Sequence, residues 1–294
     1  MNGATDQGAV NQEGALPAGA LQNYVDKWLA AQPQQRMALV FVDARRYPGH
    51  IALAALGQEL LAAAYGNREP SVAAAKLNWW VDELAGAATS GGRHPLTRVL
   101  FDDERAHAIA SERWLAPVLA AIAQLEDGTA ADFSVQLAAA APLHGALAAL
   151  ETEWWFGAEA SPERAARVAT LSHLLHALRR LEDDVERDRL PLPMAQLARH
   201  GLSRAQLRTP SAQRQAAIGA QLSDLLGAWR AASQLSGPLS AFRGLESRHG
   251  LAMAQRASRS ADALKTLHQQ QAYRGLRSTW QAWQAARAWR QHAP

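Results

Sequence analysis

Helical spacing of the apolar residues is the feature that most restricts the fold of this chain. From Leu21 onward apolar residues recur at helical intervals almost throughout, and no segment shows the apolar–polar alternation of strands joined by hairpin turns. Glycine, proline and serine interrupt the pattern, and Pro48 and Pro95 stand where a first helical turn would begin. The sequence therefore predicts an all-α domain with helices at about 20–31, 36–45, 48–66, 69–88, 95–109, 112–125, 130–157, 162–188, 203–208, 210–234, 238–268 and 270–291.

Length and composition are those of one globular domain. A chain of 294 residues, with 48% apolar and 19% charged residues, can bury a large core. We expect a single helical domain over residues 19–294 and a disordered tail over residues 1–18, which are small and polar. The absence of cysteine excludes disulfides and thiolate metal sites. The net charge of +3 is small and no block of basic residues stands out, so no nucleic-acid partner is expected.

The sequence shows no export signal and no membrane-spanning pattern. Its first residues lack both a basic segment and an apolar segment, and no window holds about 18 uninterrupted apolar residues. We therefore expect no transmembrane helix and a cytoplasmic location, with peripheral contact at the inner membrane surface left open.

The C-terminal stretch is amphipathic and rich in tryptophan and arginine. Its apolar stripe consists of Tyr273, Leu276, Trp280 and Trp283, and the basic residues around it are Arg274, Arg277, Arg287 and Arg290. Tryptophan and arginine together suit a membrane surface, whereas packing in a core or against a second subunit is the more common use of such a helix. Both interpretations stay open at this point.

Three segments carry the strongest motif signal. They are HIALAALGQELLAAA at 50–64, AAAKLNWWVDEL at 73–84, and ALRRLEDDVERDRLPLP at 177–193, which continues into MAQLARHGLSRAQL. In this order and at this separation they resemble the squalene/phytoene synthase family. The resemblance implies an all-α, isoprenoid-synthase-type helical bundle around a central cavity, in which the helix at 48–66 faces the helix at 162–188.

The first aspartate motif of that family is replaced in this chain. A gapless match from Gln58 and Glu59 puts Leu61, Ala62 and Tyr65 at the positions of the acidic residues. None of these three side chains can bind Mg²⁺, which prefers carboxylate oxygens. Gln58 stands where the family has an arginine.

The second aspartate motif is partly kept. Arg180 replaces its first aspartate, Asp183 and Asp184 match the Glu-Asp pair that follows, and Asp188 replaces a glycine. Asp184 is the one well-placed remnant of the metal site. The resemblance implies that the cavity positions are Gln58, Leu61, Ala62, Tyr65, His173, His176, Arg179, Arg180, Asp183 and Asp184, and that a diphosphate would be bound by Arg179, Arg180, Arg187 and Arg189.

The same residues also have plainer interpretations. The charged run can be a solvated helix end with ion pairs one turn apart, such as Arg180–Asp184. In the cavity, the same pair would neutralise the space of a lost metal site. His173 and His176 can be buried, hydrogen-bonded histidines or, less commonly, ligands of a transition metal.

These observations leave three hypotheses for the function. The first is a catalytically degenerate family member that binds a prenyl diphosphate or another apolar lipid, or that assists assembly with a protein partner. One branch of the superfamily, associated with respiratory complex I assembly, similarly lacks the aspartates. The second is an active prenyltransferase of isoprenoid synthesis with an altered diphosphate site, and the third is a helical scaffold unrelated to isoprenoids. No cofactor is expected, and Mg²⁺ is needed only under the second hypothesis, where it would neutralise the diphosphate leaving group.

Overall fold

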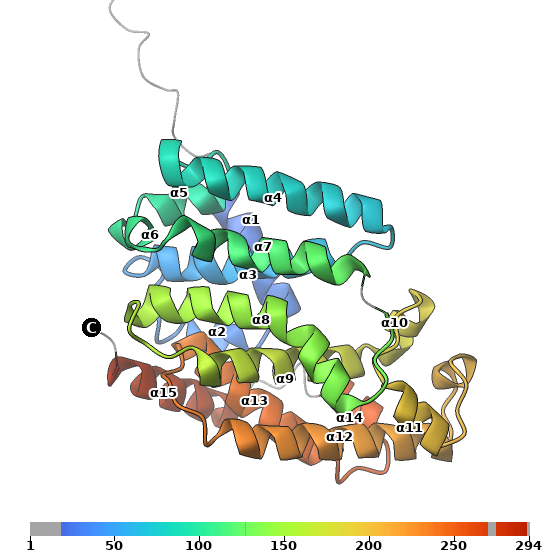
Figure 1. Cartoon of the computed structure of the whole chain (residues 1–294). Helices are drawn as coiled ribbons and strands as arrows, with labels where there is room; N and C mark the ends of the chain where they lie inside the picture. Colours follow the sequence, from blue (N-terminus) through green and yellow to red (C-terminus); the bar gives the residue numbers. More distant parts are fainter. Residues whose placement is uncertain (1–18, 127, 270–274, 293–294) are drawn as a thin grey trace, which may run out of the picture.

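The computed structural model describes residues 19–126, 128–269 and 275–292, and within them it contains helices and no strand (Figure 1). The prediction of an all-α fold is therefore confirmed, while the tail predicted at 1–18 lies outside the described residues. The α-helices are α1 (Ala20–Ala31), α2 (Gln35–Ala38), α3 (Pro48–Tyr65), α4 (Pro70–Ser90), α5 (Pro95–Phe101), α6 (Glu104–Ala108), α7 (Ser111–Ala123), α8 (Phe133–Phe156), α9 (Glu163–Arg179), α10 (Leu181–Glu186), α11 (Met194–Arg199), α12 (Ala212–Ala232), α13 (Ala241–Ala257), α14 (Ala263–Gln269) and α15 (Leu276–Arg290).

The antiparallel pair α8 and α9 occupies the middle of the bundle. Figure 1 shows α3, α4, α5 and α7 on one side of this pair and α12, α13 and α15 on the other. α8 packs against both α7 and α9, and α9 packs in turn against α12 and α13. Two large apolar clusters follow from this arrangement, one joining α3, α4 and α7 and the other joining α9, α12 and α14.

Several helices begin at the signals that the sequence carries. Pro48, Pro70 and Pro95 each occupy the first turn of their helix, where the missing backbone N–H costs no helical hydrogen bond. Asp132 and Ser211 cap α8 and α12 by accepting a hydrogen bond from the backbone N–H three residues later. Local chemistry therefore sets where most of the long helices start.

Some predicted helices are shortened or divided in the structure. The helix expected at 36–45 is reduced to α2: residues 39–46 are not helical, and Tyr47, directly before Pro48, has the non-helical angles φ −127° and ψ 50°. The helix expected at 162–188 is broken at Arg180, whose N–H is shared between the carbonyls of His176 and Ala177. Such a tightened last turn is common at helix ends, and the chain resumes as α10.

Other boundaries also differ from the prediction. The helix expected at 95–109 divides at Asp103, whose side chain caps α6. The helix expected at 238–268 divides before α14, where Asp262 accepts a hydrogen bond from the Lys265 N–H at 3.0 Å. α11 was not expected as a helix. Residues 270–274 of the last predicted helix, including Tyr273 and Arg274, lie outside the described residues.

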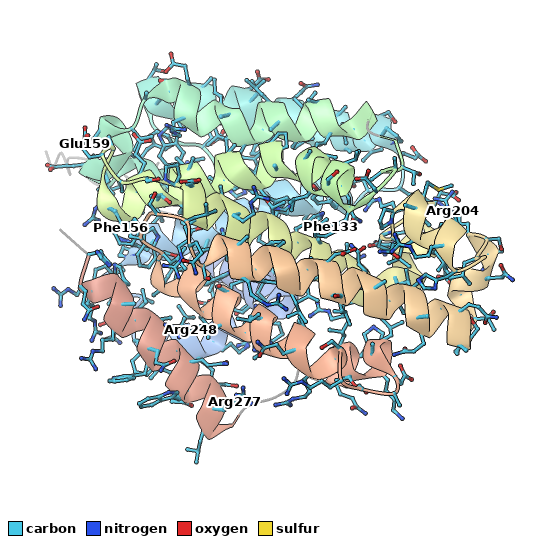
Figure 2. The ribbon with its side chains drawn as sticks, turned by 60° about the horizontal axis from the view of Figure 1, so that its bottom comes forward. Phe133, Phe156, Glu159, Arg204, Arg248 and Arg277 are labelled. Carbon is cyan, nitrogen blue, oxygen red and sulfur yellow. The ribbon has the colours of Figure 1, made fainter. Side chains whose placement is uncertain are left out.

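α8 is the one described helix that is long and apolar enough to cross a membrane by length and composition. In the bundle it lies between α7 and α9, and its polar residues Gln136, His144 and Thr152 are buried. Figure 2 shows it from Phe133 to Phe156 among the other helices. This position is that of a core helix.

Candidate functional site

A cavity of about 1120 Å³ lies between α3, α8, α9 and α13. Its α3 wall is mainly apolar, and Leu53, Ala54 and Leu61 contribute to it. It reaches the surface beside Asp188 and Arg204, whose side chains are 82% and 43% exposed. The volume is sufficient for a long apolar chain, since ligand pockets for drug-sized molecules run from about 300 to 1,000 Å³.

The cavity-facing side of α3 carries all four residues that the first motif marks. Gln58, Leu61, Ala62 and Tyr65 line the cavity. Glu59, the neighbouring acid, does not line it, and its carboxylate pairs with Lys27 at 3.5 Å. α3 therefore presents no carboxylate to the cavity.

Tyr65 joins a stack of rings that spans the cavity from α3 to α9. Its ring lies 4.6 Å from that of His173, and the His173 ring lies 4.2 Å from that of His144 on α8. The Tyr65 hydroxyl also donates a hydrogen bond to Gln124 Oε1 at 2.9 Å. Burial, reinforced by Arg189, lowers the pKa of His173 to about 4, and burial also lowers the pKa of His144. Both imidazoles are therefore neutral at pH 7.

His176 lies one turn beyond His173 and contacts a cationic side chain. Its Nδ1 lies 2.9 Å from a guanidinium nitrogen of Arg179. Burial and this positive charge lower the pKa of His176 to about 3, so the ring accepts the hydrogen bond as a neutral base. Burial and Arg179 also lower the pKa of His249, which faces the cavity from α13.

Arg180 and Asp184 form an ion pair at the cavity wall. A nitrogen of Arg180 lies 3.7 Å from Asp184 Oδ1, and the two side chains are 31% and 11% exposed. Burial raises the pKa of Asp184, although the positive charges of Arg180 and Arg189 oppose that rise. Asp183 lines the same part of the cavity. The pair thus lies where the resemblance locates the metal site.

The remaining two candidate arginines differ in position. Arg189 lines the cavity and donates to the backbone carbonyls of Tyr65 and Asn67, the latter at 3.0 Å, so it fastens the end of α3 to the segment after α10. Arg187 is not among the residues that line the cavity. Between them, Asp188 has φ 60°, the left-handed conformation that favours glycine and that aspartate tolerates. The backbone therefore keeps a glycine-like turn despite the substitution.

The Arg180–Asp184 pair should contribute modestly to stability, because it is partly open to solvent. We expect Arg180→Ala to lower the free energy of unfolding by about 1 kcal/mol, well below the 3–5 kcal/mol of a dry pair. A double-mutant cycle with Asp184→Asn, measured by urea unfolding, reports the coupling. Strict additivity would show that the two residues do not communicate and would exclude the repair of a lost metal site.

A cluster that the sequence analysis did not identify lies on the same cavity. Arg243 of α13 donates to Glu151 of α8 at 2.5 and 3.1 Å and to Glu246 at 2.5 Å. All three side chains are at most 17% exposed, and all three line the cavity. The sequence signal was Glu151, an acidic residue near the end of the largely apolar α8, but its partner Arg243 lies 92 residues away.

The side chains at the cavity do not fit a magnesium cluster. Such a cluster on a diphosphate needs carboxylates from both sides of the cavity. α3 offers Leu61, Ala62 and Tyr65, and the opposite wall has the guanidinium of Arg180 beside Asp184. Among the described residues, no group of three or more histidine, aspartate or glutamate side chains is arranged to hold a metal ion.

Comparison with known proteins gives the family of the chain. Residues 36–284 match the family model described as squalene/phytoene synthase. No curated protein matches the sequence.

Solved structures with a similar fold include a dehydrosqualene synthase in complex with ligand, at 12% identity and a TM-score of 0.58, covering 92% of this chain and 99% of that one. They also include squalene synthase HpnC from Alicyclobacillus acidocaldarius, at 16% identity and a TM-score of 0.60, covering 89% of this chain and 98% of that one. These likenesses confirm the isoprenoid-synthase-type bundle. Because the family model spans most of the sequence, the chain belongs to the squalene/phytoene synthase family.

Proposed function

We propose that the protein binds a prenyl diphosphate, or an apolar lipid with a similar anionic head, and does not condense prenyl diphosphates. The observation that carries this proposal is the cavity itself, which combines an apolar α3 wall with Arg179 and with Arg180, the residue at the position of a metal-binding aspartate in the resemblance. Guanidinium groups bind phosphate oxygens in bidentate fashion without a metal ion.

The apolar part of the ligand would lie along α3. Leu53, Ala54 and Leu61 offer it hydrocarbon contacts, and Arg179 and Arg180 line the same cavity. A lipid with its anionic head at these arginines and its chain along α3 would contact both the basic and the apolar part of the lining. Family membership argues against the hypothesis of a scaffold unrelated to isoprenoids. A role in assembly with a protein partner is compatible with binding, and no contact in the structure favours it separately.

Binding of farnesyl diphosphate without Mg²⁺ tests the proposal. We expect the wild-type protein to bind it in buffer containing a chelator, and the double variant Arg179→Gln, Arg180→Gln to bind it about tenfold or more weakly, because hydrogen bonds between charged groups each contribute about 1.5–3 kcal/mol. Farnesol, which lacks the diphosphate, should bind both proteins alike. Calorimetric titration or equilibrium dialysis gives the affinities.

The matched control is Arg208→Gln, since Arg208 pairs with Glu186 at 3.0 Å on the surface and does not line the cavity. This control should bind like the wild type. The proposal fails if the wild type binds neither ligand, or if the double variant loses farnesol and farnesyl diphosphate equally.

A further inference from the structure

The outer face of α15 carries large apolar side chains that no other described element covers. Leu276 is 92% exposed, Trp280 55% and Trp283 36%. Their spacing of four and three residues puts them on one side of the helix. The opposite side is buried against the bundle through Ala282, Trp289 and their neighbours. α15 therefore has two apolar faces, and only the inner one is packed against the bundle.

The aromatic side chains of the outward face pack against each other and against an arginine. The rings of Trp280 and Trp283 stack with centroids 4.7 Å apart, and the guanidinium of Arg287 lies over the Trp283 ring at 5.5 Å. Figure 2 shows α15 at the rim of the molecule, with Arg277 in its first turn. Together with Leu276, these tryptophans form a shallow apolar strip about two helical turns long.

The charge around this strip has one sign. α15 contains Arg277, Arg287 and Arg290, all exposed, and no aspartate or glutamate. Arg290 also donates to the carbonyl of Phe41 at 3.1 Å, which joins α15 to the turn after α2.

α2 and the turn after it add a further exposed apolar side chain and further basic residues to this surface. Val40 is 65% exposed, and Arg36, Arg45 and Arg46 are exposed, with Asp43 as the acidic residue among them. The combined surface is apolar in its centre and strongly basic around it.

From this surface we infer that α15 and the turn after α2 dock the protein onto an anionic lipid bilayer. Tryptophan rings are favoured at the boundary between headgroups and acyl chains, and arginines beside them attract anionic headgroups. A second copy of the chain would bring the same basic residues face to face, and the surface offers them no row of acidic partners. This inference goes beyond the proposed ligand binding and does not depend on it.

Sedimentation with lipid vesicles tests the inference. The full chain should bind vesicles in which part of the phosphatidylcholine is replaced by phosphatidylglycerol, and bind pure phosphatidylcholine vesicles much more weakly. The double variant Trp280→Ser, Trp283→Ser should lose about tenfold or more of the binding. The double variant Arg277→Gln, Arg287→Gln should lose about 25-fold, since each arginine near an anionic surface contributes about fivefold. Salt should weaken the binding of the wild type.

Trp79→Ser is the matched control, because Trp79 of α4 is 43% exposed and lies away from α15. It should bind vesicles like the wild type. The inference is overturned if the wild type does not bind anionic vesicles, if it binds neutral vesicles equally well, or if the tryptophan variants bind unchanged. A dimer that dissociates on Trp280→Ser, Trp283→Ser, seen by light scattering without any vesicle binding, would assign the face to a second copy instead.

Discussion

Incubation of the protein with farnesyl or geranylgeranyl diphosphate and Mg²⁺ should release no pyrophosphate above a heat-denatured control. Head-to-head condensation begins with loss of diphosphate from an allylic carbon, and several Mg²⁺ ions neutralise that leaving group in catalysis of this kind. Leu61, Ala62 and Tyr65 give the α3 wall no metal ligand, and Arg180 puts a positive charge opposite them. The positive charge of Arg180 would therefore repel a Mg²⁺ ion from the position where the family binds one.

The assay needs an active family member under the same conditions as its positive control, with lipid extracts checked for squalene and phytoene. Folding of the sample is verified independently, by its helical circular dichroism spectrum and a cooperative thermal unfolding transition. Formation of either hydrocarbon at a rate above the denatured control would contradict the prediction and would support an altered diphosphate site in an active enzyme. If neither turnover nor binding is detected, the prediction of no turnover holds, but the proposed ligand is refuted.

Arg243→Met should lower the free energy of unfolding by about 3–5 kcal/mol, because it leaves two carboxylates without their cation in a buried site. Arg243 is hydrogen-bonded to Glu151 and Glu246, and Ser240 also donates to Glu151. Burial raises the pKa of Glu246, which Arg243 partly opposes, so removal of Arg243 would favour protonation of that group. Urea unfolding at pH 7 measures the loss.

Two comparisons separate loss of charge from loss of packing. The triple variant Arg243→Met, Glu151→Gln, Glu246→Gln should recover much of the stability, since no buried charge remains unpaired. Arg208→Met removes an ion pair whose side chains are 59% and 58% exposed, and it should cost less than about 1 kcal/mol. If Arg243→Met costs no more than Arg208→Met, the buried cluster has no special part in stability.

The sequence anticipated the helices better than their interruptions. Apolar periodicity located the long helices, and Pro48 and Pro95 marked the starts of α3 and α5, because these signals act within one or two turns. The break at Arg180 has no such signal. α9 ends at Arg179 and α10 begins at Leu181, although the residues on both sides of the break are good helix formers.

The candidate site was also predicted only in part from the sequence. Tyr65 and His173 were identified from their motif positions, but their contact with His144 was not, since α8 has no recognised motif. The Arg243 cluster likewise joins α8 to α13. A pairing between residues so far apart depends on how the helices pack, and helical periodicity carries no information about it.

The sequence by itself determined the helical class and the identity of the side chains at the former metal positions, because both depend on short-range pattern. It also determined that Arg180 and Asp184 lie one turn apart. Only the tertiary structure decided which of these groups are removed from water. Packing of α3, α8, α9 and α13 shields His173 from water enough to keep its ring neutral, leaves the Arg180–Asp184 pair partly exposed, and exposes Trp280 while burying Trp289 of the same helix. The free energy of a charge or a ring depends on its surroundings, and those are set by residues from distant parts of the chain.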